Sequence, residues 1–230
     1  MKETVSCIIP VYNGERFIDA AIQSVLGQTV TVSEIIVVDD GSNDGTKGKV
    51  AEFGGAVSYV RQENQGSVAA RNHGLRLASG HYVAFLDADD LWQPEKIALQ
   101  VERFRQEPRL GACCTYMQNF WMEEVAGEIS GCEGDRLTAP QPGVASTLMA
   151  KARVFDEVGS LDATLHHRDI QDWMIRVRSA GWQIDTLQQV LVRRRVHGGN
   201  VSRNRIDTGD QELLRLARET IARKRRSLAT

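Results

Sequence analysis

The chain has 230 residues, of which 42% are hydrophobic and 25% charged, with a formal net charge of −2. This length suits one domain, or one domain with an appendage. The nearly balanced charge argues against a nucleic-acid-binding protein, which is usually strongly basic. No apolar run reaches membrane-spanning length, and the start of the chain has no signal-peptide pattern, so we expect neither feature.

The cysteine pattern indicates a reducing compartment. The four cysteines form no CxxC pair and show no zinc-site spacing. Cys7 and the adjacent Cys113 and Cys114 lie in apolar, strand-like runs, and the fourth is Cys132. We therefore expect reduced cysteines in or near the core of a cytoplasmic protein.

The first half of the chain alternates between strand and helix patterns. Apolar runs, rich in β-branched residues, predict four strands, over 5–10, 34–38, 57–61 and 82–86. Helical spacing predicts four helices, over 16–29, 46–53, 65–78 and 94–106. This order predicts an α/β fold with a mostly parallel sheet covered by helices. Right-handed crossovers would then place the loops after these strands on one rim.

The second half has a different pattern. Strand-like runs over 110–117 and 120–125 could form a meander, and 128–142 has the composition of a loop. Further strands are expected over 144–149, 183–186 and 190–196, and helices over 152–158, 169–180 and 211–226. The last helix is amphipathic and ends in four basic residues, 223–226. Its cations could meet anionic lipid, although a solvated helix end or an oligomer contact is favoured.

Two carboxylates, Asp87 and Asp89, follow the fourth predicted strand. Open α/β sheets bind ligands at this carboxyl end, and buried like charges need a neutralising cation. Magnesium or manganese is usually held by one or two carboxylates plus substrate phosphates. The alternative is that Asp89 or Asp90 merely caps the helix near Pro94.

Other rim loops carry polar groups that suit a nucleotide. The first strand leads into Pro10–Asn13, and the second into Asp39 and Asp40, whose carboxylates could accept hydrogen bonds from a base or ribose. Turn chemistry is the alternative for these acids. Arg71, in the third predicted helix, is a fixed cation that can bond phosphate oxygens at two points, or a solvated helical arginine.

Together these segments resemble the family 2 glycosyltransferases, inverting enzymes with the GT-A fold. The resemblance is carried by VSCIIPVYNGERFIDAAIQSVLGQT, EIIVVDDGSNDGT, RQENQGSVAARNHGL and YVAFLDADDLWQPEK. These segments fall in the family's order and cover nearly all of 4–105. A looser similarity continues through 154–162, 169–181 and 192–200.

The resemblance implies a nucleotide-sugar donor and a divalent metal. The residues expected to contact the nucleoside or its phosphates are Pro10, Tyr12, Asp39 and Arg71. Asp87 is expected near the ribose or the metal, and Asp89 is expected to bind Mn²⁺ or Mg²⁺ bridging the diphosphate. The family commonly places a histidine where His197 stands, and imidazole suits Mn²⁺ better than Mg²⁺. A surface histidine in a glycine loop is the alternative.

Inversion needs a base that deprotonates the acceptor hydroxyl. The family's base is the second acid of an acidic pair just before a helix that carries a further Asp-Trp. Asp172 and Trp173 match that later pair, so Asp169 matches the first acid and Ile170 stands where the base is expected. Either Asp169 serves as the base, or Asp172 does, or the chain has lost transfer. Asp169 is favoured because it lies nearer the helix start. The alternative is that Asp169 caps the helix and Asp172 is a surface acid.

We therefore predict a single domain, with a nucleotide-sugar-binding half over 1–108, an acceptor-side half over 109–200 and a helical tail over 201–230. The predicted activity is metal-dependent inverting transfer from an NDP-sugar, UDP-linked in the first instance, to a hydroxyl of a glycan, lipid-linked sugar or small molecule. Polysaccharide synthesis, a membrane-peripheral position and a homodimer are further expectations. The alternative is a nucleotide-sugar-binding protein without catalysis. A dehydrogenase is disfavoured because no GxGxxG follows the first strand.

Overall fold

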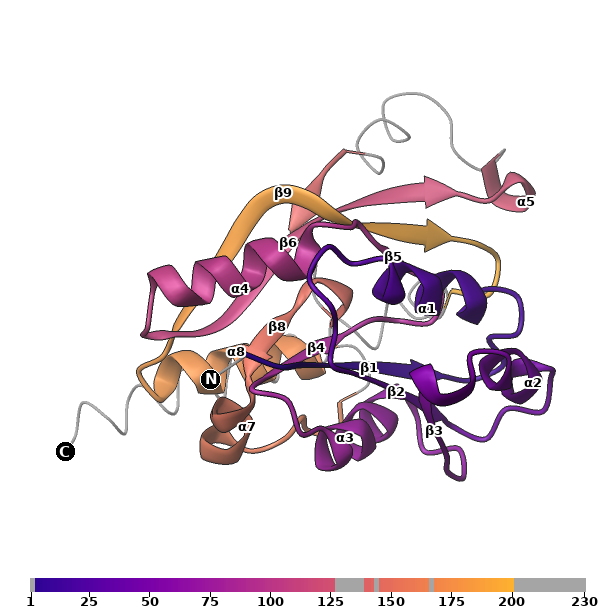
Figure 1. Ribbon diagram of the computed structural model, residues 1–230, viewed down its shortest axis with the longest axis horizontal. Helices are drawn as coiled ribbons and strands as arrows, with labels where there is room; N and C mark the ends of the chain where they lie inside the picture. Colours follow the sequence, from indigo (N-terminus) through magenta and orange to yellow (C-terminus); the bar gives the residue numbers. More distant parts are fainter. Residues whose placement is uncertain (1–2, 127–138, 143–144, 166–167, 201–230) are drawn as a thin grey trace.

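The computed structural model describes residues 3–126, 139–142, 145–165 and 168–200 (Figure 1). Cys132, the predicted helix over 211–226 and most of the predicted loop over 128–142 lie outside the described residues. Within the described part, no helix is long and apolar enough to cross a membrane.

One sheet runs through the described part of the chain, in the order β3-β2-β1-β4-β8-β6-β9-β5, with β7 paired to β6. The strands are β1 (Val5–Val11), β2 (Glu34–Asp39), β3 (Ser58–Arg61), β4 (Tyr82–Phe85), β5 (Leu91–Trp92), β6 (Leu110–Trp121), β7 (Gln141–Pro142), β8 (Met149–Lys151) and β9 (Gln183–Val196). The helices are α1 (Ile18–Leu26), α2 (Thr46–Ala51), α3 (Ser67–Leu77), α4 (Lys96–Gln106), α5 (Glu123–Ala126), α7 (Ala152–Val158) and α8 (Asp169–Ser179), with short 3₁₀ turns η1 (Gly54–Ala56) and η2 (Ala145–Thr147).

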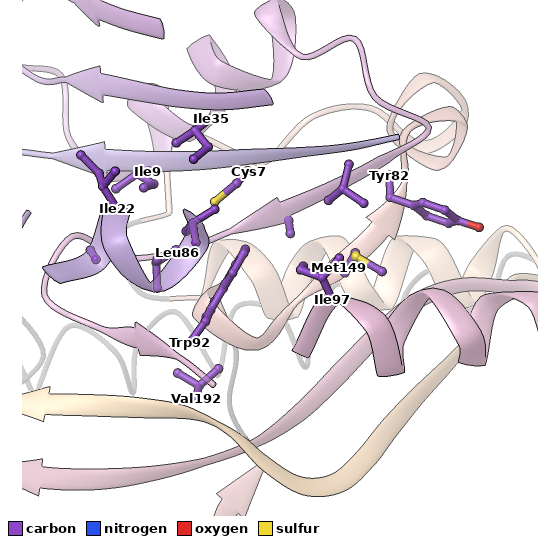
Figure 2. Close-up of a cluster of buried hydrophobic side chains, with 14 of the residues drawn as sticks. Cys7, Ile9, Ile22, Ile35, Tyr82, Leu86, Trp92, Ile97, Met149 and Val192 are labelled. Carbon is purple, nitrogen blue, oxygen red and sulfur yellow. The ribbon is translucent and has the colours of Figure 1, made fainter. Parts of the chain in front are cut away.

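The parallel half of the sheet is as predicted. β1 lies between β2 and β4, and β3 pairs with β2, all in parallel. β1, β2 and β4 are buried on both faces, whereas β3, at the edge of the sheet, is partly exposed. Cys7 and Ile9 point into one apolar cluster with α1 and α4 (Figure 2), whereas Ile8 points into another with α7 and α8. Alternate residues therefore feed opposite cores, as the pleat of a strand requires.

The predicted meander is wrong. Residues 110–121 form one strand, β6, and α5 follows where a second strand was expected. β9 is likewise one strand in place of two, and it runs parallel to β6 with a register shift that leaves Gln188 and Gln189 unpaired. Polar residues such as Gln118 interrupt the apolar pattern of β6. They lie opposite arginines of β9, however, and continue the pairing of the two strands.

Two shorter segments also differ from prediction. The expected strand over 144–149 is replaced, where it is described, by η2, and β8 starts only at Met149. β5 was not predicted, because two residues carry no periodic signal; it pairs antiparallel with β9. Cys7, Cys113 and Cys114 are buried and unpaired, which confirms their placement in the core.

Helix α3 lies close against β1, and a glycine permits this approach. A Cβ on Gly74 would overlap the side chain of Ile8. The contact matters for the site, because α3 carries Arg71 one turn before Gly74. The close packing fixes where that arginine can reach.

Candidate functional site

The carboxyl ends of β1, β2 and β4 meet at one rim of the sheet. Val11 lies opposite Asp39, and the Asp40 N–H donates to the Val11 carbonyl at 2.8 Å. On the other side, the Leu86 N–H donates to the Ile8 carbonyl at 3.0 Å, just before Asp87. The expected gathering of the three loops on one rim is therefore observed.

The residues expected at the nucleoside differ in accessibility. Tyr12 is 52% exposed on the rim, whereas Pro10 is a buried residue of β1. Asp39 is buried and accepts hydrogen bonds from the Ser42 N–H at 2.7 Å and the Tyr59 hydroxyl at 2.5 Å. Tyr12 thus presents a free ring, while both oxygens of Asp39 already have partners.

Asp40 organises the start of α3. One oxygen accepts from the Gln65 N–H at 2.9 Å and the other from the Gly66 N–H at 2.8 Å. Gly66 has φ +91°, a conformation that favours glycine. Asp40 therefore fixes the entry into the helix that carries Arg71.

Arg71 joins two carboxylates from distant parts of the chain. Its Nη2 donates to Asp87 Oδ1 at 2.7 Å and its Nη1 to Asp169 Oδ2 at 3.2 Å. The side chains of Arg71 and Asp169 are 8% and 7% exposed, and that of Asp87 is 37% exposed. The Nε of Arg71 is buried without a partner. The solvated-arginine alternative is therefore wrong.

Asp89 contacts the loop after β9. Its Oδ2 lies 3.2 Å from His197 Nε2 and accepts from Asn200 Nδ2 at 2.8 Å. Asn200 Oδ1 also accepts from the His197 N–H at 2.6 Å, and the ring of Phe17 lies 4.6 Å from the histidine ring. Asn200 was not singled out in the sequence, although an asparagine after two glycines is typical of a side chain that bonds its own turn.

The chemistry of these groups fits a divalent cation. Among the described residues, no cluster of three or more His, Cys, Asp and Glu side chains could hold a metal ion. Asp89 and His197 offer one carboxylate and one imidazole 3.2 Å apart. This small set suits magnesium or manganese, which take most of their remaining ligands from substrate phosphates and water.

Asp90 holds together the loop that follows β4, residues 87–90, and does not cap the following helix. We call this segment, which carries Asp87 and Asp89, the DxD loop. Asp90 accepts from the Ser146 hydroxyl at 2.6 Å and from the Arg195 N–H at 3.2 Å, while the Asp87 N–H donates to Ser146 Oγ at 3.1 Å. The N-terminus of α4 has no side-chain cap. Burial raises the pKa of Asp90 well above its ordinary range, and Asp89 and Asp87 add to this shift.

The two acids of α8 have different surroundings. Burial raises the pKa of Asp169, and Arg71 partly opposes this shift. Asp172 is also buried, but it pairs with Arg176 at 2.8 Å, whose Nη1 donates to the Val158 carbonyl at 2.6 Å. Asp169, in contrast, contacts the rim through its bond to Arg71. Asp172 is not the surface acid that one alternative assumed.

Ile170, at the position expected for a base, belongs to the core. It is 2% exposed and lies in the apolar cluster that contains Trp173 and Val177. Trp173 stacks on Phe155 with 4.2 Å between ring centroids. The register fixed by Trp173 therefore points Ile170 away from solvent and leaves Asp169 at the helix start.

A sheet whose parallel half carries carboxylates, a buried arginine and an exposed tyrosine at its carboxyl rim defines an open α/β protein, a class that binds ligands at this rim. The sequence profile of Glycosyl transferase family 2 matches residues 6–151. The chain belongs to this family.

Two relatives from Escherichia coli illustrate the range of similarity. Chondroitin synthase is 25% identical over 227 residues, covering 95% of this chain and 33% of that protein. UDP-Glc:alpha-D-GlcNAc-diphosphoundecaprenol beta-1,3-glucosyltransferase WfgD is 44% identical over 99 residues, covering 42% of this chain and 39% of that protein. The matches therefore span only 33% and 39% of the length of these two relatives.

Solved structures share the fold. The mannosyltransferase PcManGT from Pyrobaculum calidifontis, in complex with GDP-Man and Mn²⁺, has a TM-score of 0.75 at 21% identity and covers 96% of this chain and 65% of that one. S. aureus TarS 1–349 in complex with UDP has a TM-score of 0.66 at 19% identity. The match covers 84% of this chain and 60% of that one. The predicted GT-A fold is thereby confirmed.

Proposed function

We propose that this chain transfers a sugar from a nucleotide-sugar donor to an acceptor hydroxyl, with inversion and with a divalent metal. The observation that carries the proposal is the link that Arg71 makes between Asp87, at the candidate donor site, and Asp169, the candidate base. The relatives support a nucleotide-sugar donor: WfgD is named for UDP-Glc, and the PcManGT structure contains GDP-Man. A UDP-sugar is the first donor to test.

The donor would bind along the rim. We infer that Tyr12 stacks on the base, with Pro10 and Asp39 shaping the nucleoside site beneath it. Arg71 would face the phosphates with its guanidinium, which Asp87 and Asp169 hold at the rim and which can bond phosphate oxygens at two points. Asp87 would hold Arg71 in place and lie near the ribose.

Asp89 and His197 would hold the metal. When bound, Mn²⁺ or Mg²⁺ supplies Lewis-acid stabilisation of the negative charge that develops on the departing diphosphate. Asn200 would keep both ligands in position, since it bonds the Asp89 carboxylate and the His197 backbone.

Asp169 would act as the base. The acceptor oxygen forms a bond to the anomeric carbon, the bond from that carbon to the diphosphate breaks, and the hydroxyl proton passes to an Asp169 oxygen. A raised pKa makes Asp169 a stronger base than an ordinary aspartate. Asp172 is the weaker choice, because it lies one turn deeper in α8 and pairs with Arg176, whereas Asp169 starts the helix and contacts Arg71 at the rim.

The division into a donor half over 1–108 and an acceptor half over 109–200 also stands as a proposal. It rests on the position of Tyr12, Asp39 and Arg71 before the boundary and of Asp169 after it. A cytoplasmic position, contact with a membrane through 201–230, and a homodimer remain predictions from the sequence.

A donor-hydrolysis or transfer assay with Mn²⁺ tests the proposal. Asp89→Ala should lose metal-dependent turnover, and Asp169→Asn should lose turnover while keeping UDP affinity. Asp156→Asn, an exposed acid on α7, is the matched control. Equal turnover in wild type and Asp89→Ala would refute the metal assignment, and full turnover in Asp169→Asn would refute the base.

A second candidate is a donor-binding protein without transfer. The burial of Ile170 where the family places its base favours it. It predicts tight UDP–Mn²⁺ binding with no turnover across a broad acceptor panel. Any turnover that depends on Asp169 would count against it.

A further inference from the structure

Three arginines and two phenylalanines form a continuous stack beside Asp89 and His197. The guanidinium carbon of Arg16 lies 5.0 Å from the centroid of the Phe17 ring. Arg195 lies between the two rings, 4.8 Å from Phe17 and 4.7 Å from Phe120, and Arg193 lies 4.5 Å from Phe120. We call these five residues the guanidinium ladder.

The ladder starts at the candidate metal residues and extends away from them. Arg195 Nε donates to the Asp89 carbonyl at 3.1 Å, and Phe17 contacts the His197 ring. Phe120 lies opposite Arg195 in the paired strands β6 and β9, which run side by side toward α5 (Figure 1). Because Arg193 and Arg195 are two residues apart on β9, the ladder extends for roughly 7 Å along that strand.

The ladder gathers more positive charge than its neighbours neutralise. Arg16 forms a two-point pair with Glu124, at 2.6 and 3.0 Å. Within the described ranges, neither Arg193 nor Arg195 forms an ion pair with a carboxylate.

Such an arrangement suits an anion. Each cation–π contact at a partly exposed site contributes only about 0.5–1 kcal/mol, and the like charges oppose one another. A guanidinium fork binds phosphate or carboxylate at two points, which would offset this repulsion. Arg193 is exposed and Arg195 half-buried, so both are accessible to a ligand.

We propose that the guanidinium ladder binds an anionic group, a phosphate or a carboxylate, on the sugar acceptor. This inference rests on the proposed transfer function. The donor's own diphosphate is the less suitable occupant, because a diphosphate held at Asp89 carries no further anion to place beside Arg193.

Calorimetric titration of the full chain tests the proposal, with and without saturating UDP and Mn²⁺. The probes are glucose 1-phosphate, methyl glucuronide and neutral methyl glucoside. We expect one or both anionic sugars to bind and the neutral one not to. The stronger of the two identifies the anion. Arg193→Gln should weaken that binding about tenfold, as expected for one lost charged hydrogen bond, and leave UDP affinity unchanged.

Arg76→Gln, an exposed arginine on α3, is the matched control and should bind as the wild type does. Equal binding of the anionic sugars by Arg193→Gln and wild type would overturn the proposal, as would equal binding of the neutral glucoside. A parallel loss of UDP affinity in Arg193→Gln would assign the ladder to the donor and also overturn it. Failure of the wild type to bind UDP would refute the proposed function instead, because the titration without nucleotide still tests the ladder.

Discussion

Replacing Arg71 by methionine should destabilise the protein in a pH-dependent way. The substitution leaves the buried Asp169 carboxylate without its cation and removes the bond to Asp87. Breaking a buried pair typically costs about 3–5 kcal/mol. The bond to Asp87, whose side chain is 37% exposed, adds only about 0–1 kcal/mol because solvent screens it. We therefore expect a loss of about 3–5 kcal/mol at pH 8.

The loss of folding stability in Arg71→Met should be smaller at low pH. Arg71 lowers the pKa of Asp169 against the effect of burial, so its removal raises that pKa further. A carboxyl group whose folded pKa exceeds its unfolded value favours the folded state at low pH. That contribution is lost as the pH rises toward the folded pKa. The variant should therefore recover about 1.4 kcal/mol for each pH unit over which Asp169 becomes protonated.

Urea unfolding at pH 5.5 and pH 8, followed by circular dichroism, measures both effects. Arg76→Met on the same helix is the control and should change stability by less than about 0.5 kcal/mol. In the double variant Arg71→Met/Asp169→Asn, most of the deficit at pH 8 should disappear, because no unpaired buried charge remains. A deficit below about 1 kcal/mol at pH 8, or one that does not change with pH, would refute the reasoning.

Three further outcomes are expected. Ser146→Ala removes two hydrogen bonds that hold the DxD loop, so it should cost about 1–3 kcal/mol in urea unfolding and weaken UDP–Mn²⁺ binding; unchanged values would contradict this. Burial lowers the pKa of Lys96 to about 7, so wild-type stability should rise between pH 7 and pH 10 relative to Lys96→Met. The Trp92 ring, 4.1 Å away, favours the charged form of Lys96 and reduces this rise of stability with pH. Curves of Tm against pH that run parallel in the two proteins would count against this prediction. Gly74→Ala should lower stability by about 1–3 kcal/mol, because its methyl group would overlap Ile8, and a neutral effect would show that α3 can move.

The parallel half of the fold was predictable because three of its strands, β1, β2 and β4, are short and mostly apolar runs buried on both faces. In β1, Cys7, Ile8 and Ile9 are each 0% exposed, and the one polar residue, Ser6, precedes this apolar stretch and does not divide it. The long strands β6 and β9 were not predictable in the same way. Each contains polar residues that lie opposite one another, such as Asn119 and Arg194, and that pairing depends on residues far away in sequence.

The site was predictable only at the level of its loops. Local sequence was enough to place Tyr12, Asp39 and Asp87 after their strands, and the strands then brought them to one rim. The partners of these residues were beyond reach. The bond from Arg71 to Asp169 joins positions 98 residues apart. One partner of Asp90, Ser146, lies in a segment that has no recognisable motif.

Helix α8 shows why spacing alone could not choose between the two candidate bases. Asp169 and Asp172 are three residues apart and so lie near each other on the helix surface. However, Asp169 is the first residue of α8 and reaches Arg71, whereas Asp172 lies one turn deeper and is paired with Arg176. The buried Ile170 between them fixes the rotation of the helix. The isoleucine at the family's base position therefore does not by itself remove a candidate base. Asp169, one residue earlier, still contacts Arg71, and Arg71 links Asp169 to the DxD loop.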